Sequence, residues 1–217
     1  HEAGLAVPAI VDARPSATGD LPQAAREAGI RVLTGTGIAE VKGRKSVTGV
    51  VLCAQAGEGA ATDEIACEAV AMSGGWSPVV HLWSHCGGKL IWDDAEAHFR
   101  PNPAPTGHDG KPFVITAGAA SGAETAGDVL ADAETAAGAA ADALGRSLPD
   151  ADAAGTNDPH EEPMAPVWIM PQGAGPAKRM KMWLDYQNDV KVSDVRLAAQ
   201  EGYESVEHTK RYTTLGM

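Results

Sequence analysis

The chain has 217 residues, a formal net charge of −12 and a pI near 4.9. It is long enough for one large or two small domains, and its acidic balance argues against nucleic acid as a partner. No apolar run reaches the ~18 residues of a membrane span, no signal-peptide pattern opens the sequence, and Cys53, Cys67 and Cys86 lack CxxC spacing, so we expect a cytoplasmic protein with reduced thiols and no membrane partner.

The first predicted strand covers residues 7–11 and leads into Asp12. In a Rossmann unit, a strand that ends in an acidic residue places its carboxylate against the ribose of a bound dinucleotide. The glycine-rich turn expected about 20 residues upstream is absent, so we expect the sequence to start inside such a unit. The alternative is that Asp12 only caps a loop. A predicted helix over 21–29 and a predicted strand over 30–33 continue the α/β alternation.

Three β-rich runs, 38–42, 47–53 and 65–72, are separated by glycine-bearing turns and predict a β-meander. The segment Ser-Gly-Gly-Trp-Ser-Pro at 73–78 follows. It resembles the Ala-Thr-Gly-x-x-Pro turn of flavoproteins that bind two dinucleotides, where glycine lets the backbone pass close to a nucleotide. Gly74 and Gly75 are therefore candidate cofactor-binding residues, and an ordinary tight turn is the alternative.

His81, His85 and Cys86 lie close enough in sequence for a metal hypothesis, because histidines at i and i+4 share a helical face. No second group of ligands follows at a suitable spacing, so we assign no metal and expect a short packed helix. Their role stays open. A strand is predicted to begin at Lys89 and end at Asp93.

A buried strand is predicted to end at Ala117, followed by a turn of small residues and a long helix that reaches Leu144. Glycines in the turn allow close approach, and the amides of a helix N-terminus favour a pyrophosphate. The turn also resembles the second nucleotide-contacting motif of the same flavoproteins, which implies NAD. A packing turn between helix and sheet is the alternative. Acidic residues of the helix, including Asp132, are expected on its solvated face. The candidate NAD-binding residues here are Gly118, Ala119, Ala120, Gly122 and Thr125. We expect the backbone N–H groups of this turn to face an open cleft shared with residues 73–78.

The fold class predicted overall is α/β: a partial two-dinucleotide-binding, Rossmann-like region of the flavoprotein disulfide-reductase type, followed by a small helical domain. Its predicted boundaries are 1–145 for the α/β region, 146–166 for an acidic, proline-rich linker, and 167–217 for the mainly helical part. In the last part we expect a short strand over 167–170 and a helix over 194–201 behind Ser193. A second helix is expected behind Ser205.

Two cations and two hydroxyls lie within a few residues of one another near the end of the chain: Lys210, Arg211, Thr213 and Thr214. Cationic side chains and O–H donors at this density form a plausible phosphate-binding set. The simpler alternative is that the cations only complement the helix dipole.

Three stretches, Asp185–Val190, Leu197–Tyr203 and Ser205–Met217, resemble in order and spacing the alpha subunit of heterotetrameric sarcosine oxidase. The resemblance implies a segment that precedes the folate-binding domain. It also implies NAD in the alpha subunit, and FMN shared with the beta subunit, with Lys210, Arg211, Thr213 and Thr214 on the FMN phosphate. We therefore expect these four side chains to be exposed and unpartnered in this chain. FAD and tetrahydrofolate belong to the full complex and not to this segment. The implied partners are the beta, gamma and delta subunits, and the implied reaction is oxidative demethylation of sarcosine to glycine.

The last fifty residues also resemble a two-helix module that holds a [2Fe–2S] cluster in several amine dehydrogenases, but they contain no cysteine to ligate one. No amine-oxidising residue is recognised, so we assign no catalytic residue and expect the segment alone to be inactive. Two other functions stay open: a subunit of a related amine or opine dehydrogenase, and an interaction scaffold with a vestigial nucleotide crevice.

Overall fold

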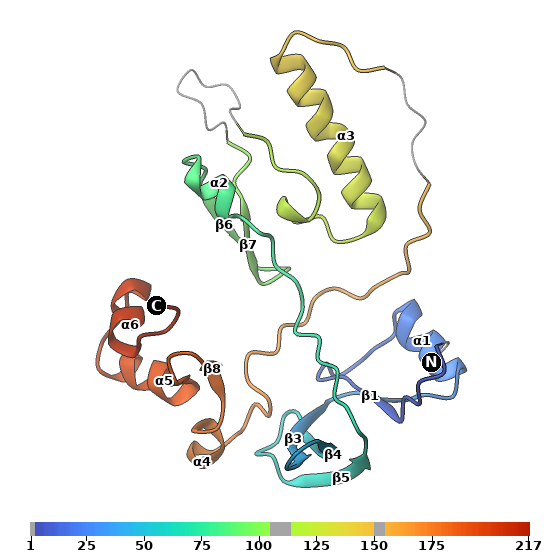
Figure 1. Cartoon of the computed structure of the whole chain (residues 1–217), viewed down its shortest axis with the longest axis vertical. Helices are drawn as coiled ribbons and strands as arrows, with labels where there is room; N and C mark the ends of the chain where they lie inside the picture. The colour runs from blue at the N-terminus through green and yellow to red at the C-terminus, as the bar shows by residue number, and fades with distance from the viewer. Residues whose placement is uncertain (1–2, 105–113, 150–154) are drawn as a thin grey trace. The chain divides into compact units, whose positions relative to one another are not determined.

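The computed structural model describes residues 3–104, 114–149 and 155–217 and has a mixed α/β architecture (Figure 1). Contacts divide the chain into two compact units. One contains the residues up to Ala17 together with Ala25–Val70 and Val167–Met217; the other contains Thr18–Ala24 and Ala71–Pro166. No helix among the described residues is long and apolar enough to cross a bilayer.

The N-terminal strand β1 (Ala9–Val11) pairs in parallel with β2 (Arg31–Leu33), and helix α1 (Asp20–Glu27) connects them in sequence. The chain turns away from the helix at Gly29, two residues after its end, and the φ of +78° there suits glycine. The predicted strand–helix–strand order is confirmed. A Rossmann-like fold is not confirmed, because β1–β2 is the one parallel pair among the described strands.

A three-stranded antiparallel meander follows, formed by β3 (Thr36–Gly43), β4 (Val47–Ala54) and β5 (Ala61–Ala66). Gly43 permits the first turn with a φ of +133°, since a Cβ there would lie 2.0 Å from the Ser46 carbonyl oxygen. The predicted meander is confirmed, but its third strand was placed too late: residues 67–72 have no regular structure.

The hydrophobic core lies on this meander. Val50, Leu52 and Ile65 are buried, and Val11 of β1 and Leu33 of β2 pack against them. Valine and leucine face inward from the central strand β4, as the β-propensity of its sequence indicates. The parallel pair and the meander therefore share one core.

In the second unit, the short helix α2 (His81–His85) leads into an antiparallel hairpin of β6 (Leu90–Asp93) and β7 (His98–Pro101). Trp83 is 5% exposed, and its indole N–H donates to the Lys89 carbonyl oxygen at 2.7 Å. The short helix and β6 agree with the prediction, whereas β7 was missed. The predicted strand before Gly118 is not formed over 114–117, and residue 113 lies outside the described residues.

A 3-10 turn, η1 (Gly118–Ala120), precedes the long helix α3 (Ala126–Ala143), which contains nine alanines and buries only Ala141. After this helix, residues 145–149 and 155–166 contain no helix or strand, as predicted for the linker. The stretch 150–154 lies outside the described residues.

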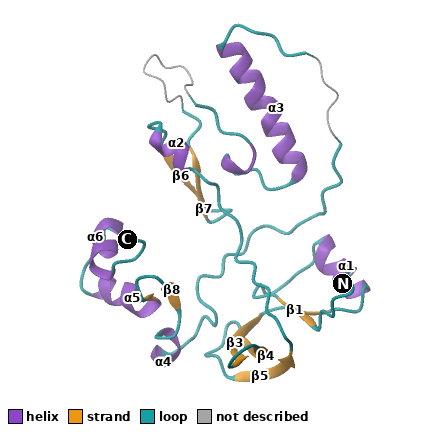
Figure 2. Ribbon diagram, viewed as in Figure 1, coloured by secondary structure: helices purple, strands orange, loops and turns teal. Residues whose placement is uncertain are grey.

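The last part contains α4 (Pro176–Arg179), the hairpin strands β8 (Trp183–Asp185) and β9 (Val190–Lys191), and the helices α5 (Val192–Gln200) and α6 (Val206–Thr213) (Figure 2). Both predicted helices are present, but α5 starts behind Lys191 rather than Ser193, with Asp194 accepting the Lys191 backbone N–H. The β8–β9 hairpin was not predicted, and 167–170 does not form the expected strand.

Residues 167–180 lie against the meander rather than apart from it. Gln55, 8% exposed, donates from Nε2 to the Ile169 carbonyl oxygen at 2.8 Å, and the backbone N–H groups of Gln172 and Gly173 donate to residues 55 and 57. The side chain of Lys178 donates to the Gly59 carbonyl oxygen. These bonds group 167–217 with the meander, and the separate domain boundary at 167 stays a prediction.

Candidate functional site

Asp12 lies just beyond β1, as the sequence predicts for a ribose-binding carboxylate. Its oxygens are engaged by Arg14, whose Nη2 is 2.7 Å from Oδ2 and whose backbone N–H donates to Oδ1 at 2.9 Å. Burial raises the pKa of Asp12, but the hydrogen bonds and charge of Arg14 outweigh it, so the pKa lies below its ordinary value. A ribose would have to share this carboxylate with a guanidinium.

Gly74 and Gly75 lie in an exposed stretch without regular structure. Gly75 has a φ of +92°, a conformation that favours glycine, while a Cβ at Gly74 would meet nothing within 4 Å. No hydrogen bond among the described residues joins 73–78 to the turn at 118–122, so the cleft predicted between them is not formed by such contacts.

The turn at Gly118 holds a carboxylate of its own chain. Asp132 of α3 accepts the Gly118 backbone N–H at 2.7 Å and the Ser121 hydroxyl at 2.5 Å. The prediction that this amide faces an open cleft, and that Asp132 is only solvated, is therefore wrong. Ala119 is exposed and Ala120 is half-buried.

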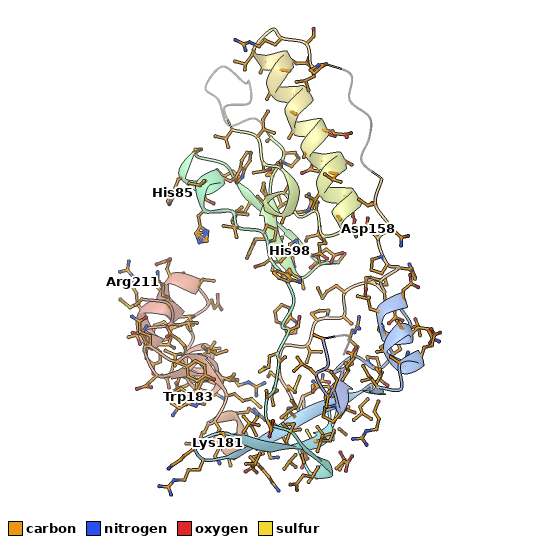
Figure 3. The ribbon with its side chains drawn as sticks, turned by 45° about the vertical axis from the view of Figure 1, so that its right-hand side comes forward. His85, His98, Asp158, Lys181, Trp183 and Arg211 are labelled. Atoms are coloured by element: carbon orange, nitrogen blue, oxygen red, sulfur yellow. The ribbon has the colours of Figure 1, made fainter. Side chains whose placement is uncertain are left out.

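The backbone N–H groups at the N-terminus of α3 also donate to side chains of this chain, among them Asp158 (Figure 3). Thr125 is the N-cap and accepts the Asp128 backbone N–H at 3.1 Å. Asp158, from the acidic segment, accepts the backbone N–H groups of Ala126 at 3.1 Å and Gly127 at 2.8 Å. These hydrogen bonds lower the pKa of Asp158, and the bond from Gly127 contributes most. The amides expected to hold a pyrophosphate thus bind a carboxylate, the anion that suits this position.

His98, at the start of β7, is a buried polar residue that the sequence did not reveal. It is 5% exposed, and neither ring nitrogen has a hydrogen-bond partner among the described residues. It lies against Gly122, where a Cβ would stand at an ordinary contact distance of 3.7 Å from Nε2, and the φ of +104° favours glycine there. Elsewhere, the described residues contain no group of three or more His, Cys, Asp or Glu side chains placed to hold a metal, so His81, His85 and Cys86 gain no further ligand.

The predicted phosphate-binding residues lie together at the C-terminal end of α6. Arg211 is exposed on this helix (Figure 3), Lys210 is half-buried, and neither forms a salt bridge within the described residues. Two unpaired cations on a chain of net charge −12 form a local basic site. Their position also complements the negative end of the helix dipole.

Helix geometry divides these residues between two faces. Lys210 and Thr213, three positions apart, share one face. Arg211 belongs to the neighbouring face and lines a shallow pocket of about 320 Å³ with Tyr203, His208 and Tyr212. The two tyrosine rings lie 4.6 Å apart between centroids. A single phosphate held by both cations would lie over the edge between the faces.

The two threonines are not free donors, contrary to the expectation that they are unpartnered. Thr213 donates its hydroxyl to the Thr209 carbonyl oxygen at 2.7 Å and accepts the Leu215 backbone N–H at 3.3 Å. Thr214 has a φ of +64° and donates its hydroxyl to the Thr213 carbonyl oxygen at 2.6 Å. A phosphate would bind first to the cations, and the hydroxyls would have to leave backbone carbonyl groups to join it.

Comparison with known proteins extends along nearly the whole sequence. The family described as Sarcosine oxidase A3 domain matches residues 179–217. The chain is 36% identical to sarcosine oxidase subunit alpha of Rhizobium meliloti (strain 1021) over 99% of its own length. It is 32% identical to the subunits of that name from Corynebacterium sp. (strain P-1) and Corynebacterium sp. (strain U-96), each over 96% of its length.

These matches cover 20%, 21% and 22% of the relatives, so the chain spans about a fifth of the length of the curated relatives it matches. The match to the Rhizobium meliloti subunit covers 99% of the chain and therefore includes both compact units. The chain belongs to the sarcosine oxidase alpha subunit family and corresponds to a fragment of such a subunit.

Proposed function

We propose that this chain is the part of a sarcosine oxidase alpha subunit that binds the phosphate of FMN at the end of α6. In this proposal the assembly is an oxidoreductase that demethylates sarcosine to glycine, and the beta, gamma and delta subunits are its partners. The relatives carry the name sarcosine oxidase, which supports the reaction. The alternatives are a subunit of a related amine or opine dehydrogenase and a non-catalytic scaffold.

The observation that carries the FMN proposal is the pair of cations at the end of α6. Lys210 and Arg211 project from the last turn, have no salt-bridge partner among the described residues, and lie within the segment matched by the A3 domain family. Arg and Lys are the side chains that bind phosphate oxygens, and a charge-assisted hydrogen bond contributes about 1.5–3 kcal/mol. FMN bound there would be shared with the partner subunit and would carry electrons onward.

A second proposed ligand is NAD, held by the region before residue 145. The parallel order β1–α1–β2, with Asp12 at the end of β1, supports a partial dinucleotide-binding fold. In this proposal Asp12 meets the adenosine ribose, Gly74 and Gly75 let the backbone approach, and the turn at 118–122 lies near the pyrophosphate. Asp132 and Asp158 occupy that turn and the α3 N-terminus, so the pyrophosphate would bind after these carboxylates move away.

The test is the cofactor content of the whole complex. We expect Lys210→Ala/Arg211→Ala to lower the FMN recovered per complex, measured by chromatography after denaturation and digestion, and to leave NAD content unchanged. The matched control is Arg44→Ala/Lys45→Ala, which removes an adjacent, exposed basic pair from the β3–β4 turn. A double variant at 210 and 211 that keeps its full FMN would contradict the proposal. Absence of NAD from the wild-type complex would contradict the second ligand.

A further inference from the structure

The last residue of β8, Asp185, has a carboxylate that binds both the adjacent turn and a segment distant in sequence. Oδ1 of Asp185 accepts the backbone N–H groups of Gln187 at 2.9 Å and Asn188 at 3.1 Å, which closes its own turn. Oδ2 accepts the Asn188 side-chain amide at 2.9 Å and the backbone N–H of Gly216, 31 residues away, at 2.9 Å. One oxygen therefore shapes the β8–β9 turn, and the other holds the segment after α6.

Asn188 adds a second tie to the same segment. Its Nδ2 also donates to the Met217 carbonyl oxygen at 3.3 Å. Left-handed backbone at Thr214 (φ +64°) and Gly216 (φ +66°) reverses the chain, and the Met217 backbone N–H donates to the Thr214 carbonyl oxygen at 3.2 Å. Residues 214–217, called here the 214–217 turn, are thus folded back onto the β8–β9 hairpin.

The 214–217 turn fixes the end of α6. Leu215 donates its backbone N–H to the Thr213 hydroxyl, so the path of the chain after residue 213 orients that hydroxyl. Lys210 and Thr213 lie on the same face immediately before this turn. Movement of Gly216 away from Asp185 would release the last residues of the helix, because a helix end without further contacts frays.

We propose that Asp185 is a positioning residue for the α6 phosphate site. Its hydrogen bond to Gly216 keeps the 214–217 turn in one conformation, and this turn holds Lys210, Thr213 and Thr214 in place for an anionic ligand. This inference rests on the proposed function, since it concerns the same site. Asp185 does not itself contact the ligand.

The hydrogen bonds that support this role also keep the carboxylate charged. The pKa of Asp185 is lowered from 3.8 to about 2. The largest cause is the hydrogen bond from the Asn188 side chain, followed by those from the backbone N–H groups of Gly216 and Asn188. An ionised carboxylate accepts at both oxygens and cannot donate. Asp185 therefore remains a hydrogen-bond acceptor for Gly216 throughout the physiological pH range.

Asp185→Asn separates the two tasks of this side chain. The Asn Oδ1 can still accept the two amides of its own turn, whereas its Nδ2 would face the donors of Asn188 and Gly216. Asp189→Asn is the matched control, because it removes a negative charge from the same turn at an exposed residue with no hydrogen bond among those described. Asn188→Ala is a second variant, which removes the side-chain hydrogen bonds to Asp185 and to the Met217 carbonyl oxygen while Asp185 remains.

All variants are tested in the whole complex. For Asp185→Asn and Asn188→Ala we expect severalfold faster amide hydrogen exchange at 214–217 and reduced FMN per complex, with NAD content and melting temperature close to wild type. Asp189→Asn should match wild type in every measurement. Unchanged exchange at 214–217, or faster exchange with full FMN content, would overturn the positioning role.

The Lys210→Ala/Arg211→Ala variant distinguishes this failure from that of the proposed function. If the double variant loses FMN and Asp185→Asn keeps it, the phosphate site stands and the positioning role is wrong. If the double variant keeps FMN, the phosphate site itself is wrong, and the role proposed for Asp185 falls with it.

Discussion

Single carboxylates determine how the candidate ligand-binding segments of this chain are held. Asp132 accepts the amide of Gly118, Asp158 accepts the amides that open α3, and Asp185 accepts the amide of Gly216. Backbone N–H groups without partners are costly when buried, and a nearby Asp satisfies them with a charge-assisted bond. The sequence shows these residues as ordinary acidic positions, because the amides named here lie 14 to 32 residues away from them.

We expect the carboxyl group of Asp185 to titrate at a lower pH than an ordinary aspartate. Its pKa in the folded protein is about 2, below the ordinary value of 3.8. The lowered pKa means that the carboxylate stabilises the fold above its ordinary pKa, and that this stabilisation is lost as the pH falls through about 2. NMR titration of the Asp185 carboxyl carbon should give a midpoint near 2, and a midpoint at 3.8 would show that the bonds to Asn188 and Gly216 are not maintained in solution.

At the scale of elements, α3 depends on a residue outside itself. The helix buries only Ala141, so its stability depends more on its ends than on its packing. The backbone N–H groups of its first residues have no acceptor within the helix and donate to Asp158 in the predicted linker that follows. That segment, expected only to connect two domains, also contributes His160, whose backbone N–H donates to the Asp20 carboxylate at 2.7 Å.

We expect Asp158→Asn to weaken the N-terminus of α3, because a neutral amide replaces the charged acceptor of the Ala126 and Gly127 amides. Hydrogen exchange should become severalfold faster at residues 126–129 and stay unchanged near Ala141. Glu134→Gln, an exposed mid-helix residue without a described hydrogen bond, is the control. Equal exchange at 126–129 in both variants would show that Asp158 does not hold the helix.

At the scale of the whole molecule, the sequence predicts what depends on local pattern. The helices α1, α3 and α5 end near their predicted residues and α6 begins behind Ser205 as predicted, because capping residues and glycine stops lie within these helices or next to them. The meander follows from β-branched runs separated by glycine. The strands β7, β8 and β9 were missed, since each has four residues or fewer and is held mainly by its partner strand.

What the sequence could not predict are contacts between distant segments. Gln55 binds Ile169 across 114 positions and groups 167–217 with the meander, although the acidic segment before residue 167 suggested a separate domain. The cations at 210 and 211 were found from their spacing, whereas the assignment of Arg211 to a pocket with Tyr203 required the folded helix.

If the end of α6 binds a flavin through its phosphate, the complex must distinguish FMN from riboflavin, which lacks that phosphate. Flavin-free complex is offered both at equal concentration, and the incorporated flavins are separated by chromatography. A charge-assisted bond of about 1.5–3 kcal/mol corresponds to a preference of roughly tenfold to a hundredfold for FMN in the wild type. Lys210→Ala/Arg211→Ala should bring the preference close to parity, and a double variant that still selects FMN as strongly as wild type would contradict the account.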